Sequence, residues 1–216
     1  MFFFPIGCLA LILFILFLPF LFLLIFFKIV NFGFISLGFS PEATILILFF
    51  ILIGSAINIP ITKKNKAYLE KSYFFGIVKR RESIIEGVSI NLGGAVVPLI
   101  ISLYFLSKTP LEPAMIATGL MIFLCFVMSK TIPGRGIVLP ALVPPVFSAI
   151  IALIVSPEFA APIAFISGVL GTLIGADILK LRKIQKYSPG MISIGGAGVF
   201  DGIFLVGIIS AFLASI

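Results

Sequence analysis

Two aspartates, Asp177 and Asp201, are the only residues of their type in the chain, and both stand in apolar stretches. An ionisable side chain at membrane depth is costly, and by default it marks a functional site. Loss of water disfavours charge on each carboxyl group, and one negative charge disfavours a second, so a facing pair can share one proton. One member would then act as a general base on water while the other donates a proton to a carbonyl oxygen. The pair therefore predicts the chemistry of an aspartic protease, which requires no metal ion and no cofactor.

Each aspartate also has a simpler interpretation. Asp177 is three residues from Lys180, so it could be solvated or could pair with that lysine at the membrane surface. Asp201 could cap a neighbouring helix, or it could bind a proton or a cation on a transport path. At this stage both interpretations stay open beside the catalytic one.

Small and polar residues accompany the aspartates. Gly196, Ala197 and Gly198 precede Asp201, and small residues let another backbone, such as a peptide strand, approach closely. The alternative is helix packing alone. Asn58 and Asn91 are expected at the same depth, as polar support for the site.

The elements that position these residues are expected to be membrane-spanning helices. Hydrophobic residues make up 61% of the 216 residues and charged ones 11%, which is too apolar for a soluble domain. We predict an all-α, polytopic fold, a single transmembrane domain over residues 1–216. The apolar runs predict seven spans, at about 5–29, 42–61, 83–106, 113–128, 137–155, 160–179 and 192–214. The polar segment 62–82 is expected to be a loop.

The basic residues predict the orientation of these spans. The loops after the second, fourth and sixth spans hold thirteen lysines and arginines, whereas the opposite side holds Lys28 and Lys108. An excess of this kind marks the cytoplasmic side, so we expect the N-terminus in the cytoplasm, the C-terminus outside and a location in the plasma membrane. The net charge of +7 is explained by these loops. The expected partner is the lipid bilayer, and no nucleic acid is expected.

Two resemblances carry further expectations. The runs INLGGAVVP, GTLIGADILKL and IGGAGVFDGIFL are similar to those of an uncharacterised multi-pass membrane family of bacteria and archaea, domain of unknown function 1614. The chain also resembles the presenilin, signal-peptide-peptidase and prepilin-peptidase group of intramembrane aspartyl proteases. That group carries one aspartate on a helix entering the cytoplasm and the other on the next helix leaving it, as Asp177 and Asp201 are expected to do.

The sequence of this chain matches the motifs of this protease group in part. The group has Gly-x-Gly-Asp, where this chain has Gly196-Ala197-Gly198 two residues farther from Asp201. A Pro-Ala-Leu motif stands here as Pro140-Ala141-Leu142, before the aspartates rather than after them. The resemblance implies that this motif and Gly196 to Gly198 flank a substrate strand.

The leading expectation is therefore an intramembrane aspartyl protease-like protein that acts on a membrane-embedded peptide. One alternative is a small proton- or ion-coupled transporter that uses Asp177, Asp201, Asn58 and Asn91 as its binding site. Another is a non-catalytic membrane scaffold.

Overall fold

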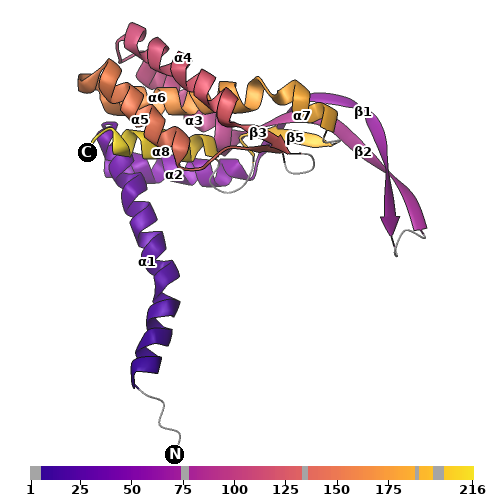
Figure 1. Ribbon diagram of the computed structural model, residues 1–216, viewed down its shortest axis with the longest axis horizontal. Helices are drawn as coiled ribbons and strands as arrows, with labels where there is room; N and C mark the ends of the chain where they lie inside the picture. Colours follow the sequence, from indigo (N-terminus) through magenta and orange to yellow (C-terminus); the bar gives the residue numbers. More distant parts are fainter. Residues whose placement is uncertain (1–5, 74–77, 133–135, 188–189, 197–201) are drawn as a thin grey trace, which may run out of the picture.

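A bundle of helices forms the body of the protein, and a long helix and a β-hairpin project from its opposite ends (Figure 1). The computed structural model describes residues 6–73, 78–132, 136–187, 190–196 and 202–216. The helical elements are α1 (Ile6–Ser36), α2 (Pro41–Ser55), η1 (Leu92–Val96), α3 (Val97–Leu106), α4 (Leu111–Met128), α5 (Val143–Val155), η2 (Pro157–Phe159), α6 (Ala160–Gly171), η3 (Thr172–Ile178), α7 (Leu181–Tyr187) and α8 (Gly202–Leu213). The strands are β1 (Asn58–Tyr73), β2 (Val78–Asn91), β3 (Lys130–Ile132), β4 (Gly136–Val138) and β5 (Met191–Ile194). Both η1 and η3 are π-helical turns, whereas η2 is a 3₁₀ turn.

Helix α6 occupies the centre of the bundle. Ten of its twelve residues are buried, and it packs against α3, α4, α5 and α8. A helix that is apolar on all sides belongs in such a place. Its small residues let the neighbours approach closely. A β-carbon on Gly171, for example, would lie 2.5 Å from the β-carbon of Met121 in α4.

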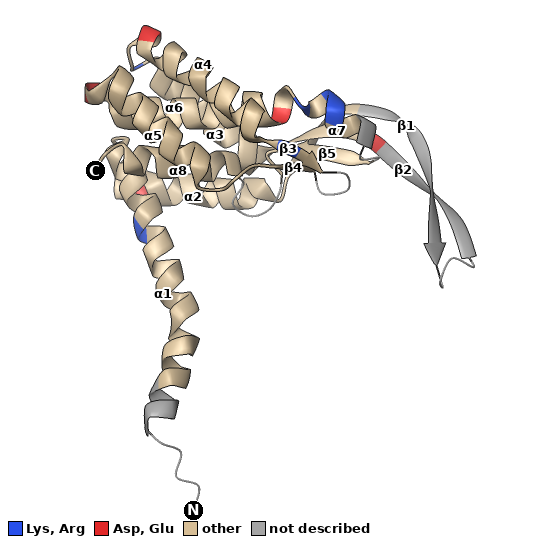
Figure 2. Cartoon of the chain, in the orientation of Figure 1, with Lys and Arg blue, Asp and Glu red and all other residues tan. Residues whose placement is uncertain are grey.

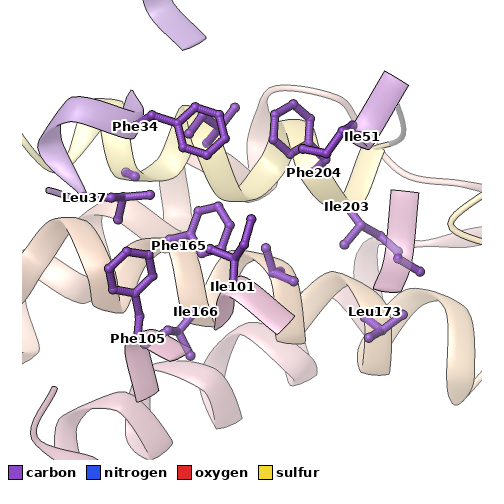
Figure 3. Close-up of a cluster of buried hydrophobic side chains, with 14 of the residues drawn as sticks. Phe34, Leu37, Ile51, Ile101, Phe105, Phe165, Ile166, Leu173, Ile203 and Phe204 are labelled. Carbon is purple, nitrogen blue, oxygen red and sulfur yellow. The ribbon is translucent and has the colours of Figure 1, made fainter. Parts of the chain in front are cut away.

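Aromatic side chains join α6 to the helices around it. Phe105 of α3 meets Phe165 of α6 edge to face, with ring centroids 6.2 Å apart. Phe34 of α1 and Phe204 of α8 lie 6.1 Å apart in the same cluster. Figure 3 shows these rings pointing into one apolar interior lined by isoleucines and leucines. The cluster ties the C-terminal end of α1 to the bundle.

The rest of α1 makes little contact with the bundle. The helix packs against α8 and α2, and its buried residues lie near its C-terminal end, at Val30 and beyond. Residues 11–25 are all exposed, and the helix runs away from the bundle in Figure 1. Such an apolar surface requires lipid or another apolar partner.

The helices bear out the expectation of a polytopic helical membrane protein in its coarse form. Three of them are long and apolar enough to cross a membrane: Leu11–Ser36, Leu111–Met128 and Pro157–Gln185. The apolar helices Pro41–Ser55, Leu92–Leu106, Val143–Val155 and Gly202–Leu213 are shorter. Each of the seven apolar runs in the sequence therefore contains a helix, and together these helices indicate a membrane protein.

The polar segment 62–82 is not the loop that the sequence analysis predicted. It belongs to a long antiparallel hairpin of β1 and β2, and β5 pairs in parallel with the base of β2. The order of strands in this sheet is β1-β2-β5, and β3 and β4 form a separate small ladder. The all-α expectation thus holds for the apolar runs and misses this sheet. Residues 58–61, 83–91, 137–138 and 192–194, which were assigned to the ends of helical spans, lie in strands instead.

Candidate functional site

Two π-helical turns, one helix and two strands converge at the end of the bundle from which the hairpin projects. The π-helical turn η1 contacts α2, α8 and β2, and the other π-helical turn, η3, contacts α8 and β5. Helix α8 therefore touches both turns, and the paired strands β2 and β5 lead to the same place. Single π-helical turns inside helices are rare and often mark functional sites. This junction is the candidate functional site.

Asp177 is on η3 and is half-buried. The turn that carries it is pressed against α4, because a β-carbon on Gly175 would lie 2.4 Å from the backbone oxygen of Ile122. Thr172 and Ala176 of the same turn are buried, and the Thr172 hydroxyl lies 3.8 Å from the Cys125 thiol. The π-helical turn therefore holds Asp177 at a fixed place beside α4.

Lys180 follows this turn and is bound to the end of α4. Its ammonium group donates a hydrogen bond to the backbone oxygen of Ser129 and lies 5.0 Å from the centre of the Phe126 ring. The lysine thus holds the C-terminal end of η3 against α4, which is a role that the sequence analysis did not foresee.

The second aspartate falls outside the described residues, together with Ala197 and Gly198. Its flanks are described on both sides. Gly196 follows β5, and α8 begins at Gly202, the residue after Asp201. Helices α6 and α8 pack against each other and run in opposite directions in Figure 1, as the expected pairing of the last two spans requires.

A network of amide and hydroxyl groups closes the base of the hairpin. Asn91, which is buried, donates from Nδ2 to the Ser55 backbone oxygen at 2.7 Å and to Asn58 Oδ1 at 3.1 Å. Its Oδ1 accepts from the Gly94 N–H at 2.7 Å and so caps η1. Ser193 of β5 donates to Asn58 Oδ1 at 2.6 Å. Asn58 and Asn91 thus bind each other, and Asn91 also binds the backbone of the junction.

The two glycine-rich runs of the chain meet at this junction. Strands β2 and β5 place Ser89 opposite Ser193 and Ile90 opposite Ile194. Gly195 then adopts a left-handed backbone with φ of 67°, and a β-carbon there would lie 2.6 Å from that of Ala95 in η1. A β-carbon on Gly196 would lie 2.1 Å from the Ser193 hydroxyl. Glycine is thus required at both places by close approach.

The Pro140-Ala141-Leu142 segment lies between β4 and α5, and all three residues are exposed. The residue before it, Leu139, packs against a cluster of Met121, Cys125 and Ala176. Ala176 is the neighbour of Asp177, so the segment begins beside η3. Neither Ser193 nor Thr172 was singled out from the sequence, although Ser193 precedes the glycine pair directly.

The two ends of the bundle differ in their balance of charge, although acidic and basic residues occur at each end (Figure 2). Arg182 and Lys183 are exposed on α7, next to the junction. Glu112 at the start of α4 and Glu158 in η2 are exposed at the other end. The basic end of the bundle is therefore also the end that carries the candidate site.

Apolar helices of this length and number define the chain as a helical membrane protein with a β-hairpin at one end. Residues 52–213 match the family described as "Protein of unknown function (DUF1614)", and the chain belongs to that family. The match begins within α2 and ends at the last residue of α8, so it covers every element of the junction. No curated protein and no solved structure matches the chain.

Proposed function

We propose that this chain is an intramembrane aspartyl protease-like hydrolase in which Asp177 and Asp201 form the catalytic pair. The observation that carries the proposal is the contact between η3, which bears Asp177, and α8, which begins one residue after Asp201. Two carboxyl groups from elements in contact, within an apolar bundle, are suited to share one proton.

The reaction would be hydrolysis of a peptide bond. The ionised carboxylate takes a proton from water while the water oxygen bonds to the peptide carbonyl carbon, and the protonated carboxyl group gives its proton to the carbonyl oxygen. The tetrahedral intermediate then collapses, the C–N bond breaks, and the amine leaves with a proton from the aspartates. Hydrolysis of the peptide bond thus requires only two carboxyl groups and one water molecule.

The surroundings of Asp177 support a peptide as the substrate. A membrane-embedded peptide must unwind before its carbonyl carbon is accessible, and unwound backbone needs hydrogen-bond partners at that depth. Among the described strands of its sheet, β5 is at an edge and ends three residues before Ala197. Gly196 and the segment from Pro140 to Leu142 would flank such a peptide, since Leu139 packs next to Ala176.

We propose further that the basic end of the bundle lies in the cytoplasm of a cell with the chain in its plasma membrane. The exposed Arg182 and Lys183 on α7 and the lysines and arginines of the hairpin support this orientation. The catalytic pair would then lie toward the cytoplasmic side, where water reaches it over a short distance.

Transport and a scaffold role remain as outcomes of the experiment rather than as proposals. Asn91 uses both of its donors and its acceptor on Ser55, Asn58 and Gly94. Both donors of this buried asparagine are used within the chain, which leaves only the second lone pair of Oδ1, so we assign it to support.

The test is cleavage of a single-span peptide substrate by the full chain in lipid vesicles. Asp177→Asn and Asp201→Asn, made separately, should each reduce cleavage to the background level, because neither carboxyl group alone supplies both the acid and the base. Thermal unfolding of each variant establishes that it is folded. Glu158→Gln is the matched control, since it removes an exposed carboxylate at the other end of the bundle and should cleave like the unaltered chain.

Cleavage that persists in either aspartate variant would refute the protease. Uptake of a solute or protons that depends on both aspartates, without cleavage, would identify a transporter instead. Loss of folding in both variants would assign the aspartates to structure.

A further inference from the structure

Asp177 stands on a helical turn that is wider than an ordinary α-helix. In η3 the Leu179 N–H donates to the Ile174 oxygen at 3.0 Å, five residues earlier, whereas an α-helical bond spans four residues. The turn therefore holds one residue more than an α-helical turn. Helices take this form rarely, and often at functional sites. The contacts around η3 must favour it over the regular helix.

The extra residue decides where each later side chain points. Successive residues of an α-helix are about 100° apart, so one extra residue sets every later side chain back by about that angle. If η3 became a regular helix, Ala176 would take the direction that Asp177 has now, and Asp177 would take that of Ile178. Ala176 is 1% exposed, Asp177 is half-buried and Ile178 is 46% exposed. A regular helix would thus expose residue 176 and turn the aspartate outward.

The first part of η3 is fixed by close packing against α4. A β-carbon on Gly175 would lie 2.4 Å from the Ile122 oxygen, and the Thr172 hydroxyl lies 3.8 Å from the Cys125 thiol. These contacts precede Asp177 along the chain. They hold the start of the turn in place, and they do not determine whether the residues after it follow a π-helical or a regular course.

Lys180 fixes the end of the turn. Its ammonium group donates to the backbone oxygen of Ser129 and lies 5.0 Å from the centre of the Phe126 ring, and a cation is favoured at the C-terminal end of a helix such as α4. Ser129 is 3% exposed and is itself bound to the last turn of α4, because its N–H donates to the Cys125 oxygen at 3.0 Å. A regular helix would turn the Lys180 side chain by about 100°, away from α4. The bond to Ser129 and the π-helical turn therefore stabilise each other.

We propose that Lys180 is a positioning residue for Asp177, which latches η3 in its π-helical form and so keeps the carboxyl group at the junction. The role in cleavage rests on the function proposed above, whereas the latch itself depends only on the contacts of η3 and Lys180 with α4. Lys180 acts through Asp177 and takes no part in the proton transfers. Loss of the latch should therefore leave substrate binding in place and misdirect the catalytic group.

The first test measures the turn itself, without cleavage. The full chain in detergent micelles carries Cys8→Ala and Cys125→Ala, so that a cysteine introduced by Ala176→Cys is its single thiol. Its rate of alkylation by N-ethylmaleimide is then measured. The thiol should react slowly, because residues 125 and 176 belong to the same buried cluster and the sulfur has only changed places within it.

Changes at Lys180 should then open or preserve this cluster. Lys180→Met removes the cation and keeps a long side chain, and it should raise the rate of alkylation at position 176 several-fold. Lys180→Arg restores a cationic donor and should keep the reaction slow. Lys183→Met, which removes an exposed cation from α7, should also keep it slow. The matched control position is Leu173→Cys, which is buried in the first part of η3 and should stay unreactive in every variant.

The second test is cleavage of a single-span peptide by the full chain in lipid vesicles. Lys180→Met should lower kcat by about 10–100-fold and leave KM nearly unchanged, because a small misplacement of a catalytic group has an effect of this size. Lys180→Arg should restore most of kcat, and Lys183→Met should cleave like the unaltered chain. Helical circular dichroism establishes that each variant is folded. Lys180→Gln, whose side chain ends one bond short of the ammonium group, replaces Lys180→Met if the latter does not fold.

The two tests separate failure of the latch from failure of the protease. Slow alkylation at position 176 in Lys180→Met would overturn the latch, whatever the result for cleavage. Faster alkylation at both 173 and 176 would also overturn it, since general loosening rather than a change of turn would then be the cause. A rise in KM with unchanged kcat would place Lys180 in substrate binding instead of positioning. If position 176 responds as expected but the unaltered chain cleaves nothing, the protease is refuted and the latch stands.

Discussion

Asn91 offers the sharpest test of how the junction is held together. The change is Asn91→Ala. The side chain is 1% exposed and makes hydrogen bonds with Ser55, Asn58 and Gly94. Loss of the cap on η1 costs about 1 kcal/mol. The half-buried Ser55 backbone oxygen also loses its donor, which costs about 1–3 kcal/mol. Together these effects predict a loss of about 2–4 kcal/mol in the free energy of unfolding.

The measurement is unfolding of the purified chain in detergent micelles, followed by loss of helical circular dichroism during titration with a denaturing detergent. Asn58→Ala is the matched control. Asn58 is exposed and accepts from Asn91 and Ser193, so water can replace it and the loss should stay below about 1 kcal/mol.

Asn91→Asp then distinguishes the role of the side chain as the cap of η1 from its role as a hydrogen-bond donor. Aspartate retains the acceptor for the Gly94 N–H and puts a negative charge at a helix start, which is favourable there. It supplies no donor for the Ser55 oxygen and Asn58 Oδ1, and it places a carboxylate against both. We expect Asn91→Asp to be as unstable as Asn91→Ala. If either variant instead unfolds at the same detergent concentration as Asn58→Ala, the network does not hold the junction and the reasoning is wrong.

Two further predictions concern glycines. Gly195→Ala should destabilise the chain by about 2–4 kcal/mol, because the residue has a left-handed backbone and the added β-carbon would lie 2.6 Å from that of Ala95. Unfolding in the same detergent titration tests this, and a stability equal to that of the unaltered chain would contradict it. Gly171→Ala should lower the free energy of unfolding by at least about 1–3 kcal/mol, because the added β-carbon would meet Met121. Gly119→Ala should raise it by up to about 1 kcal/mol, because Gly119 of α4 is exposed and has open space around it. Equal effects of these two changes would show that close approach of α4 and α6 is not what requires Gly171.

The helical part of the fold could be predicted because apolar runs carry a strong signal. Each expected span contains a helix, and α4 begins only two residues before its predicted start at 113. In the predicted fifth span the regular helix begins only at Val143, so that Pro144 and Pro145 lie in its first turn, where proline is tolerated. The apolar runs do not indicate the residue at which each helix ends. A residue of an apolar run can leave the helix for a strand without any change in hydropathy.

The sequence analysis did not predict the hairpin, because the charged residues of this segment outweighed the residues that favour strands. The segment from 62 to 82 was judged by its lysines and arginines, which suit a loop. Tyr68, Tyr73 and Val78 favour strands, and the sequence has a glycine, Gly76, between Tyr73 and Val78, which is typical of a hairpin. The charge pattern directed the prediction to the orientation in the membrane and concealed the structure of the segment.

The candidate site was predictable in composition more than in geometry. The rarity of aspartate directed attention to η3 and to the start of α8, and these elements are in contact. The sequence gave no indication that Ser89 and Ile90 lie beside Ser193 and Ile194, because parallel pairing joins residues about a hundred positions apart. The bonds from Asn91 to Ser55 and Asn58 likewise depend on the end of α2, which the sequence placed too late.

The short helices and the sheet are best understood together. A helix of 12–15 residues, such as α8 or α2, is about 18–23 Å long, whereas the apolar core of a bilayer is about 30 Å thick. The remaining depth at the basic end must be filled by backbone that is not helical, and such backbone is tolerated only inside protein or beside water. Strands β2 and β5, together with the cap that Asn91 places on η1, satisfy that backbone. The same arrangement places β5 against η3, which carries Asp177. If the proposed protease is correct, lengthening α8 into a regular helix from Ile192 should abolish cleavage, because it would remove β5.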